Sequence, residues 1–193
     1  VGATSGEIRR IVESNKVKSH FLRHALAIAS FRAVLELACK QSGETVKLLI
    51  WEQGNILCDT VEGGRMPEKK QKYSVYPDAF FALEIKGKGK AHFFLEVDRG
   101  TMSIIAKGTG SDIRKKILGY YWYHERKKYS ERYVYINLRD NQISRLHVGE
   151  NIASNYPASD ITPIRGFRVV FLVPGQLSSD GKSGGRLENI LAS

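Results

Sequence analysis

The sequence predicts a mixed α/β domain in which a central β-sheet is flanked by helices. Three observations indicate this fold class. A helical pattern early in the chain is followed by several short apolar strands. Two of these strands are joined by a glycine- and lysine-rich turn at 87–90, which is typical of a hairpin. A second helical segment then separates the hairpin from later strands, as expected for a crossover in a mixed sheet.

The expected helices follow from apolar spacing and from their end signals. Residues 19–42 present a broad apolar face and are followed by Gly43, a common C-terminal stop. Residues 1–18 are expected to form a linker or short helix. A helix is predicted from Ser111, a good N-cap residue, to about Lys128. A further helix is predicted over 141–154.

The expected strands are short apolar runs bounded by turn residues. Residues 59–74 are polar and lysine-rich, and we expect a mobile loop there. The chain after Pro174 is rich in glycine and serine, so 174–193 is expected to be a flexible tail with a short helix at 186–192. The main domain then spans 19–173. Its predicted strands are 46–52, 78–86, 91–98, 133–138 and 167–173.

Bulk composition narrows the function classes. Hydrophobic residues make up 42% of the 193 residues, enough for a core, and this excludes global disorder. The formal charge of +10 favours an anionic partner, most simply nucleic acid, although a basic soluble protein is the plainer alternative. No apolar run approaches roughly 18 residues, so no membrane span is expected. Cys39 and Cys58 form no CxxC motif, which argues against a zinc site and fits a cytoplasmic location.

Three acids mark the ends of the predicted hairpin. Asp78 opens its first strand, and Glu96 and Asp98 close the second on one shared face. A three-residue loop at 87–89 would place Asp78 opposite Asp98 on that face. A two-residue loop would turn Asp78 to the other face unless a bulge restores it. We expect the three-residue loop, because Gly89 suits its left-handed position.

Converging carboxylates predict a metal site. Like charges disfavour each other's ionisation, and Mg²⁺ or Mn²⁺ relieves that cost. Such ions orient an attacking oxygen and stabilise charge on a phosphate. Glu52, at the end of a strand, is either a further ligand or a surface acid. Lys116 on the following helix is expected to neutralise the phosphate or to activate water, with Tyr120 one turn later on the same face.

Each of these residues also has a plainer interpretation. Asp78 follows Pro77 and suits a turn, and Asp98 could pair with Arg99 or cap a turn. His24 lies on an apolar helix face and is either a core histidine or a general base. The residues that we expect to contact DNA are Lys70, Lys72, Arg99, Lys107, Lys115 and Tyr120.

These runs resemble a known family. The segments 77–83 (Pro-Asp-Ala-Phe-Phe-Ala-Leu) and 94–102 (Phe-Leu-Glu-Val-Asp-Arg-Gly-Thr-Met), followed by Lys116 and Tyr120, resemble the replication-relaxation family of plasmid and mobile-element proteins. The upstream elements His24-Ala25-Leu26, Phe31-Arg32 and Trp51-Glu52 are also similar to that family's earlier motifs. The resemblance covers most of residues 19–138.

The resemblance implies a restriction-endonuclease-like core and metal-dependent DNA nicking or relaxation, as by an endonuclease or relaxase, at a plasmid origin. It also implies a DNA-binding winged helix joined through residues 1–18. The acid-x-Lys pattern of the wider nuclease group is replaced by Glu96-Val97-Asp98, so the lysine role is expected to move to Lys116. Two alternatives stay open. One is a non-catalytic DNA-binding module for replication or copy control. The other is an oligomerising domain, such as a homodimer or a partner of replication or transfer proteins.

Overall fold

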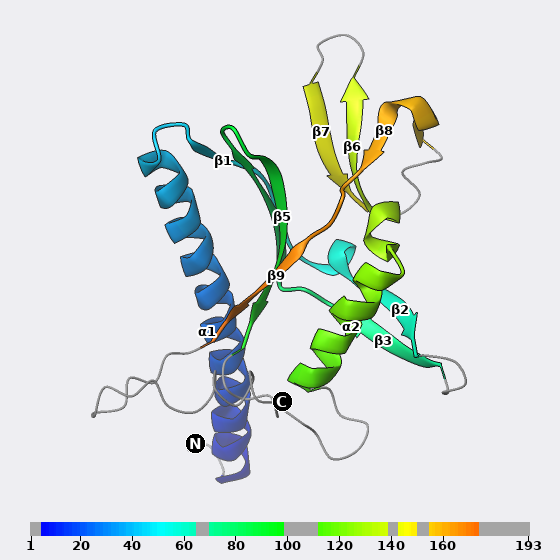
Figure 1. Cartoon of the computed structure of the whole chain (residues 1–193). Coiled ribbons are helices and arrows are strands. Elements are labelled where there is room, and N and C mark those ends of the chain that lie inside the picture. The colour runs from blue at the N-terminus through cyan, green and yellow to red at the C-terminus, as the bar shows by residue number, and fades with distance from the viewer. Residues whose placement is uncertain (1–4, 65–69, 99–111, 139–142, 150–154, 174–193) are drawn as a thin grey trace, which may run out of the picture.

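The structure is a computed structural model that describes residues 5–64, 70–98, 112–138, 143–149 and 155–173. Its centre is a four-stranded sheet of order β1-β4-β5-β9 with one long helix on each face (Figure 1). The elements are α1 (Ser5–Gln41), β1 (Val46–Glu52), β4 (Ala79–Ile85), β5 (Gly89–Val97), α2 (Ile113–Glu125) and β9 (Arg168–Leu172).

The sheet is mixed, as the sequence predicts. β1 pairs antiparallel with β4 and β4 pairs antiparallel with β5, whereas β9 joins the free edge of β5 in parallel. A parallel neighbour requires a long crossover, and here that connection includes α2. The prediction of an antiparallel start followed by a helical crossover is therefore confirmed.

The β4–β5 hairpin has an odd loop, but its position differs by one residue from the prediction. Ile85 pairs with Gly89, so the loop is 86–88, and the Lys88 amide donates to the Ile85 carbonyl at 2.9 Å. Extending the register one residue beyond Ala79 and Leu95 places Asp78 opposite Glu96. The expected pairing of Asp78 with Asp98 is wrong for this reason. The odd loop length places Asp78 at a register position on the same face as Glu96, but its side chain contacts His24 on α1.

The first helix is longer than predicted. α1 continues without a break from residue 5 to residue 41, whereas the sequence indicated a separate short helix or linker over 1–18 and a main helix over 19–42. Its inner face packs on the sheet through Ile28, with Phe31 and Leu35 beside it. Its outer face carries exposed leucines, among them Leu22 and Leu26, which are 58% and 55% exposed.

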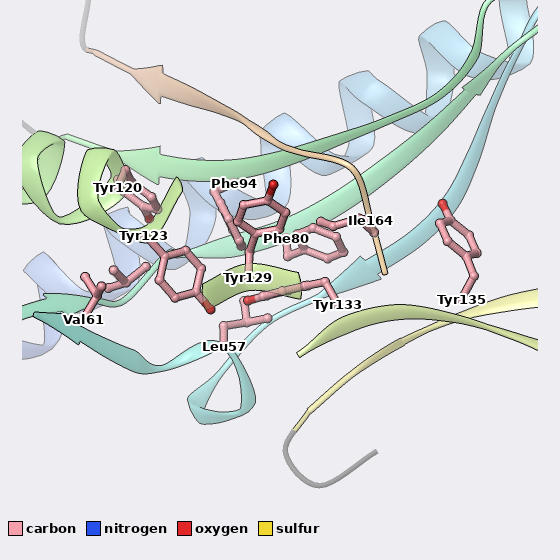
Figure 2. Packing of buried hydrophobic residues seen from close by; sticks show 11 residues of the cluster. Leu57, Val61, Phe80, Phe94, Tyr120, Tyr123, Tyr129, Tyr133, Tyr135 and Ile164 are labelled. Carbon is pink, nitrogen blue, oxygen red and sulfur yellow. The ribbon is translucent and has the colours of Figure 1, made fainter. Parts of the chain in front are cut away.

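The core has two parts, one on each face of the sheet. The face toward α1 holds Phe81, Leu95 and Val97. The face toward α2 holds an aromatic cluster in which Phe80 and Phe94 meet Tyr120, Tyr123 and Tyr133 (Figure 2). Because strand side chains alternate between faces, the even-numbered residues of β4 and β5, Glu96 among them, point toward α2.

Two smaller sheets correct the sequence interpretation. Residues expected to form a loop over 59–74 form the hairpin β2 (Asp59–Gly63) and β3 (Gln71–Val75). Residues 143–148 form a strand where a helix over 141–154 was expected. This strand, β7 (Ile143–Val148), belongs to a sheet of order β7-β6-β8. The remaining elements are β6 (Tyr133–Leu138), β8 (Ile161–Pro163) and the single turns η1 (Asn55–Leu57), η2 (Lys128–Glu131) and η3 (Ala158–Asp160).

Some expectations lie outside the described residues. These are the N-cap at Ser111 and the tail at 174–193 with its short helix. The N-cap that the structure describes is Asp112, whose side chain accepts a hydrogen bond from the Lys115 amide at 2.6 Å. Within the described ranges, no helix combines the length and the apolar character needed to cross a membrane.

Candidate functional site

The three acids lie at one end of the β4–β5 pair. Asp78 directly precedes β4, Glu96 is the penultimate residue of β5, and Asp98 follows that strand. Since the two strands are antiparallel, the start of β4 and the end of β5 meet at the same edge of the sheet. The N-terminal half of α2 and the middle of α1 approach this edge from opposite faces (Figure 1).

Glu96 is the centre of this group. Its side chain is only 2% exposed, and both of its carboxylate oxygens have partners on α2. Oε1 accepts a hydrogen bond of 2.6 Å from the Tyr120 hydroxyl, and Oε2 is in contact with the Lys116 ammonium group. Lys116 and Tyr120 are four residues apart, so successive turns of the helix present them to the same carboxylate.

Burial dominates the ionisation of this group. It raises the pKa of Glu96, the Lys116 charge and the hydrogen bonds from Lys116 and Tyr120 oppose that rise, and the nearby negative charge of Asp78 adds to it. Burial also raises the pKa of Tyr120 well above its ordinary value, and the Glu96 carboxylate strengthens the effect. The Tyr120 phenol is therefore protonated at neutral pH and acts as a hydrogen-bond donor.

Asp78 links the sheet to α1. Its Oδ2 accepts from the Val97 amide at 2.7 Å, and its own amide donates to the Leu95 carbonyl at 2.9 Å, so it extends the β4–β5 ladder. Its Oδ1 lies 2.8 Å from Nε2 of His24. Nδ1 of His24 is buried and has no hydrogen-bond partner among the described residues. Asp78 therefore has a clear structural role in addition to any chemical one.

Asp98 and Glu52 lie at the same end of the sheet as Glu96. Asp98 is nearly buried, and its amide donates to the Leu172 carbonyl of β9 at 2.9 Å. Glu52 is half-buried at the end of β1 and pairs in register with Phe80, on the face that points toward α2. The register thus places Glu52 on the same face as Glu96 but two strands away.

The donor set fits one type of divalent-metal site. In the part of the chain that the structure describes, no three His, Cys, Asp or Glu side chains are close enough to form a protein-only metal cage. Mg²⁺, however, is commonly held by one or two carboxylates, with water and substrate phosphate completing its coordination. Asp78 and Glu96 are neighbouring oxygen donors across the strand pair, and they suit such a site chemically.

The structure places the basic residues that were predicted to contact DNA in two separate regions. Lys115 and Lys116 lie in the first turn of α2, where the helix dipole is positive and attracts anions. Lys70 and Lys72 lie at the β2–β3 hairpin, where Lys70 is 3.9 Å from Glu62 and Lys72 pairs with Glu62 in register. Arg99 and Lys107 lie outside the described residues.

Sequence reasoning missed two features of this site. It named His24 without identifying Asp78 as its partner, because the two are 54 residues apart and a helix face does not reveal which strand end it meets. It also left out Arg114, an exposed residue before Lys115 and Lys116. Three consecutive cationic residues at the start of a predicted helix could have been recognised from the sequence as unusual. A helix N-terminus favours anions and not cations, so their presence there indicates an anionic partner.

Comparison with known proteins gives a family. Neither a curated protein nor a solved structure matches the chain significantly. The sequence model of the replication-relaxation family matches residues 3–137, more than half of the chain. This range contains Asp78, Glu96, Lys116, Tyr120 and His24. The chain therefore belongs to the replication-relaxation family, which associates it with DNA replication and relaxation.

Proposed function

We propose that this chain nicks DNA in the replication or relaxation of a plasmid or mobile element, in a reaction that depends on Mg²⁺ or Mn²⁺. The observation that carries the proposal is the buried Glu96 carboxylate, held by Lys116 and Tyr120 beside Asp78. A buried ionic network is often less stable than an apolar replacement of the same volume. A buried carboxylate with a perturbed pKa, such as Glu96, is accordingly a common mark of a functional site.

Each residue has a role that follows from its contacts. Asp78 and Glu96 would hold the metal ion, which orients an attacking oxygen and offsets phosphate charge when bound. Lys116 supplies a positive charge at the start of α2, where the helix dipole also favours a phosphate. The Tyr120 hydroxyl orients the Glu96 carboxylate. Because Tyr120 is buried and its pKa is raised, it is poorly suited to act as a nucleophile.

The order of elements supports the nuclease interpretation. An antiparallel three-stranded start, a helix over the acidic end, and a parallel edge strand are consistent with the restriction-endonuclease-like core that the sequence resemblance implies. In this arrangement the lysine role moves from the strand to α2, as the Glu96-Val97-Asp98 sequence requires. Lys116 does point at the acids, which keeps this relocation chemically reasonable.

One observation favours a second candidate, a non-catalytic DNA-binding module. Each of the four carboxylate oxygens of Asp78 and Glu96 already has a donor or a ring nitrogen from the protein beside it. A network of this kind holds together without an ion. The basic first turn of α2 would then serve only to bind the phosphate backbone, with strong salt dependence.

The deciding experiment is a nicking assay on supercoiled plasmid, with and without Mn²⁺. Wild-type protein is expected to convert supercoiled DNA to open circles only when the metal is present. Asp78→Asn should abolish conversion, because it removes the charge but keeps an oxygen acceptor for the Val97 amide. Glu84→Gln is the matched control, since Glu84 is an acid of β4 that pairs with Lys90, away from the acidic end.

Three results distinguish the two candidates. Metal-dependent nicking by wild type and Glu84→Gln, but not by Asp78→Asn, would establish the nuclease. Nicking that Asp78→Asn leaves unchanged would refute the assigned site. Salt-sensitive DNA binding with no nicking on a plasmid that carries the cognate origin would favour the non-catalytic module.

A further inference from the structure

A groove of about 900 Å³ lies between the β2–β3 hairpin and the α2–η2 segment. Gly63 and Lys70 line it from the hairpin side, and Tyr121, Trp122 and Arg126 line it from the helix side. Its volume is in the range of sites that bind small molecules. Tyr121 and Trp122 directly follow Tyr120, so one short stretch of α2 contributes to both the acidic site and this groove, which we call the Trp122 groove.

Trp122 occupies a place that only glycine permits. A Cβ atom at Gly63 would lie 2.1 Å from Cδ1 of Trp122, far inside van der Waals contact. The indole therefore rests directly against the backbone of β2. The Tyr121 ring meets it at 5.0 Å and 74°, and the Arg126 guanidinium carbon lies 5.5 Å from its centroid. Tyr121 itself is 43% exposed and offers an aromatic surface to solvent.

The groove differs in charge from the rest of this basic chain. Its cations Lys70, Arg126 and Lys128 are balanced by Glu62, Glu125 and Glu131. Lys70 lies 3.9 Å from Glu62, and Lys128 is in contact with Glu131. A groove that is close to neutral is a poor site for a phosphate. Donors and acceptors placed side by side instead suit the edge of a nucleobase, and aromatic rings suit its face.

We propose that the Trp122 groove binds an unpaired nucleobase of single-stranded DNA. This inference rests on the proposed function in that DNA is the ligand, but it requires no cleavage. A single strand is the appropriate form, because the face of a base in a duplex is covered by its neighbours and cannot stack on a protein ring. A base held here would position its strand beside the acidic end of the sheet, which the other face of α2 covers.

Tryptophan fluorescence tests this directly. The chain has only two tryptophans, Trp51 and Trp122, so Trp51→Phe leaves Trp122 as the sole indole. In this background we expect quenching when a thymidine strand of about 15 nucleotides is added. An abasic strand of equal length, which keeps the phosphates but lacks the bases, is expected to quench weakly or not at all. Equal quenching by both strands would overturn the proposal in favour of phosphate binding, and no quenching would overturn it altogether.

A pair of variants tests the aromatic contribution. Tyr121→Ser should weaken binding of the thymidine strand roughly 5- to 150-fold, the range that corresponds to losing one base–aromatic stack. Phe21→Ser is the control, because Phe21 is an exposed aromatic residue of α1 outside the groove. Both positions are exposed, so both variants are expected to fold, as circular dichroism can verify. Equal affinity of the two variants would contradict the proposal.

The test separates this proposal from the nuclease proposal. Asp78→Asn lies outside the groove, so it should still bind the thymidine strand more tightly than the abasic strand even if nicking is lost. If wild type binds the strand through Tyr121 but nicks nothing, the groove is supported and the nuclease proposal fails. If wild type nicks DNA while Tyr121→Ser binds the strand normally, the nuclease proposal is supported and the groove proposal fails.

Discussion

The burial of Glu96 affects the stability of the protein as well as the proposed chemistry. Its folded-state pKa is raised, so the folded protein favours the neutral acid more than the unfolded chain does. The contribution of this group to stability is fully present below the pKa of the unfolded chain. It is lost as the pH rises through the raised folded-state pKa. Above the raised folded-state pKa, therefore, ionisation of Glu96 lowers the free energy of unfolding.

This leads to a prediction for Glu96→Gln. The variant should lose nicking, yet its melting temperature at mildly alkaline pH should equal or exceed that of wild type, because the buried charge is gone. The difference should shrink in acid, where the wild-type carboxyl is itself neutral. Thermal unfolding at several pH values, followed by circular dichroism, measures both effects. A variant clearly less stable than wild type at alkaline pH would show that the contacts with Lys116 and Tyr120 outweigh burial.

His24 is predicted to position Asp78. Its Nε2 is 2.8 Å from Asp78 Oδ1, so His24→Leu should free that carboxylate and lower nicking about 10- to 100-fold, as when the support of a ligand is removed. His24→Gln places an amide nitrogen in a similar position and should recover most of the activity. Steady-state nicking rates of the two variants provide the measurement. Equal loss in both would mean that the histidine acts chemically and not by positioning.

At this scale the sequence indicated the acids but not their partners. Asp78 and Glu96 were recognisable as a set because carboxylates brought together at the ends of neighbouring strands disfavour each other's ionisation. Lys116 and Tyr120 followed from helical spacing. Their exact pairing depended on where the hairpin turns, and two glycines in the Gly87–Lys90 segment allowed several loops. The structure selects the loop 86–88, the register in which Phe80 lies opposite Phe94.

At the scale of elements, the β2–β3 hairpin shows where sequence patterns are weakest. Its strands are five residues long and largely polar on the outside, so only Val61 and Val75 signal a buried face. Similarly, residues 143–148 lie within the segment 141–154 for which a helix was expected, yet pairing with β6 makes them a strand. Tertiary pairing overrides local propensity in both cases. The long strands of the central sheet were predictable because their apolar runs are continuous.

A buried polar network attaches the β2–β3 hairpin to the rest of the domain. Asp59, at the start of β2, accepts a hydrogen bond of 3.0 Å from the Tyr123 hydroxyl and lies 3.7 Å from the Arg132 guanidinium. Arg132 also donates to the Ile56 carbonyl at 2.7 Å. Both charged side chains are nearly buried. The network therefore joins β2, α2 and η1 around one arginine.

Removing the arginine should cost more than removing the hydroxyl. Arg132→Met leaves the Asp59 charge buried without its ion-pair partner and is expected to lower the free energy of unfolding by about 3 kcal/mol or more. Tyr123→Phe removes one hydrogen bond and should cost about 1 kcal/mol. Urea unfolding curves of the two variants give the comparison. If Tyr123→Phe were as damaging as Arg132→Met, the hydroxyl and not the ion pair would hold the hairpin.

At the scale of the whole molecule, one histidine joins two sheets. His92 on β5 lies 2.9 Å from the Tyr135 hydroxyl on β6 and stacks on Phe80. Lys90 lies over the Tyr135 ring at 4.2 Å. The pKa of His92 is lowered from 6.5 to about 4, chiefly by burial and to a smaller extent by the Lys90 charge, while a hydrogen bond with the Gly166 backbone opposes the shift. His92 is therefore neutral in the folded protein through mildly acidic pH.

Acid should weaken the junction between the sheets. Because the pKa of His92 is depressed on folding, its contribution to stability is present above pH 6.5 and is lost as the pH falls toward 4. The loss over this window is of the order of 3 kcal/mol. His92→Gln should flatten this part of the stability profile, whereas His147→Gln, on β7, should not. Urea unfolding across the window tests this, and identical profiles for the two variants would contradict it.

The parallel edge strand β9 has a consequence for how the protein is made. β9 lies beyond the residues that the family model matches, yet the Leu172 carbonyl accepts the hydrogen bond that anchors Asp98. An unpaired edge beside β5 exposes backbone groups to other chains, and pairing over such a sequence distance is slow to form. During synthesis, therefore, the β4–β5 hairpin and its acidic residues emerge well before β9, the strand that pairs with β5. The edge of β5 stays open, and the Asp98 amide lacks the Leu172 carbonyl as its acceptor, until Leu172 has been synthesised.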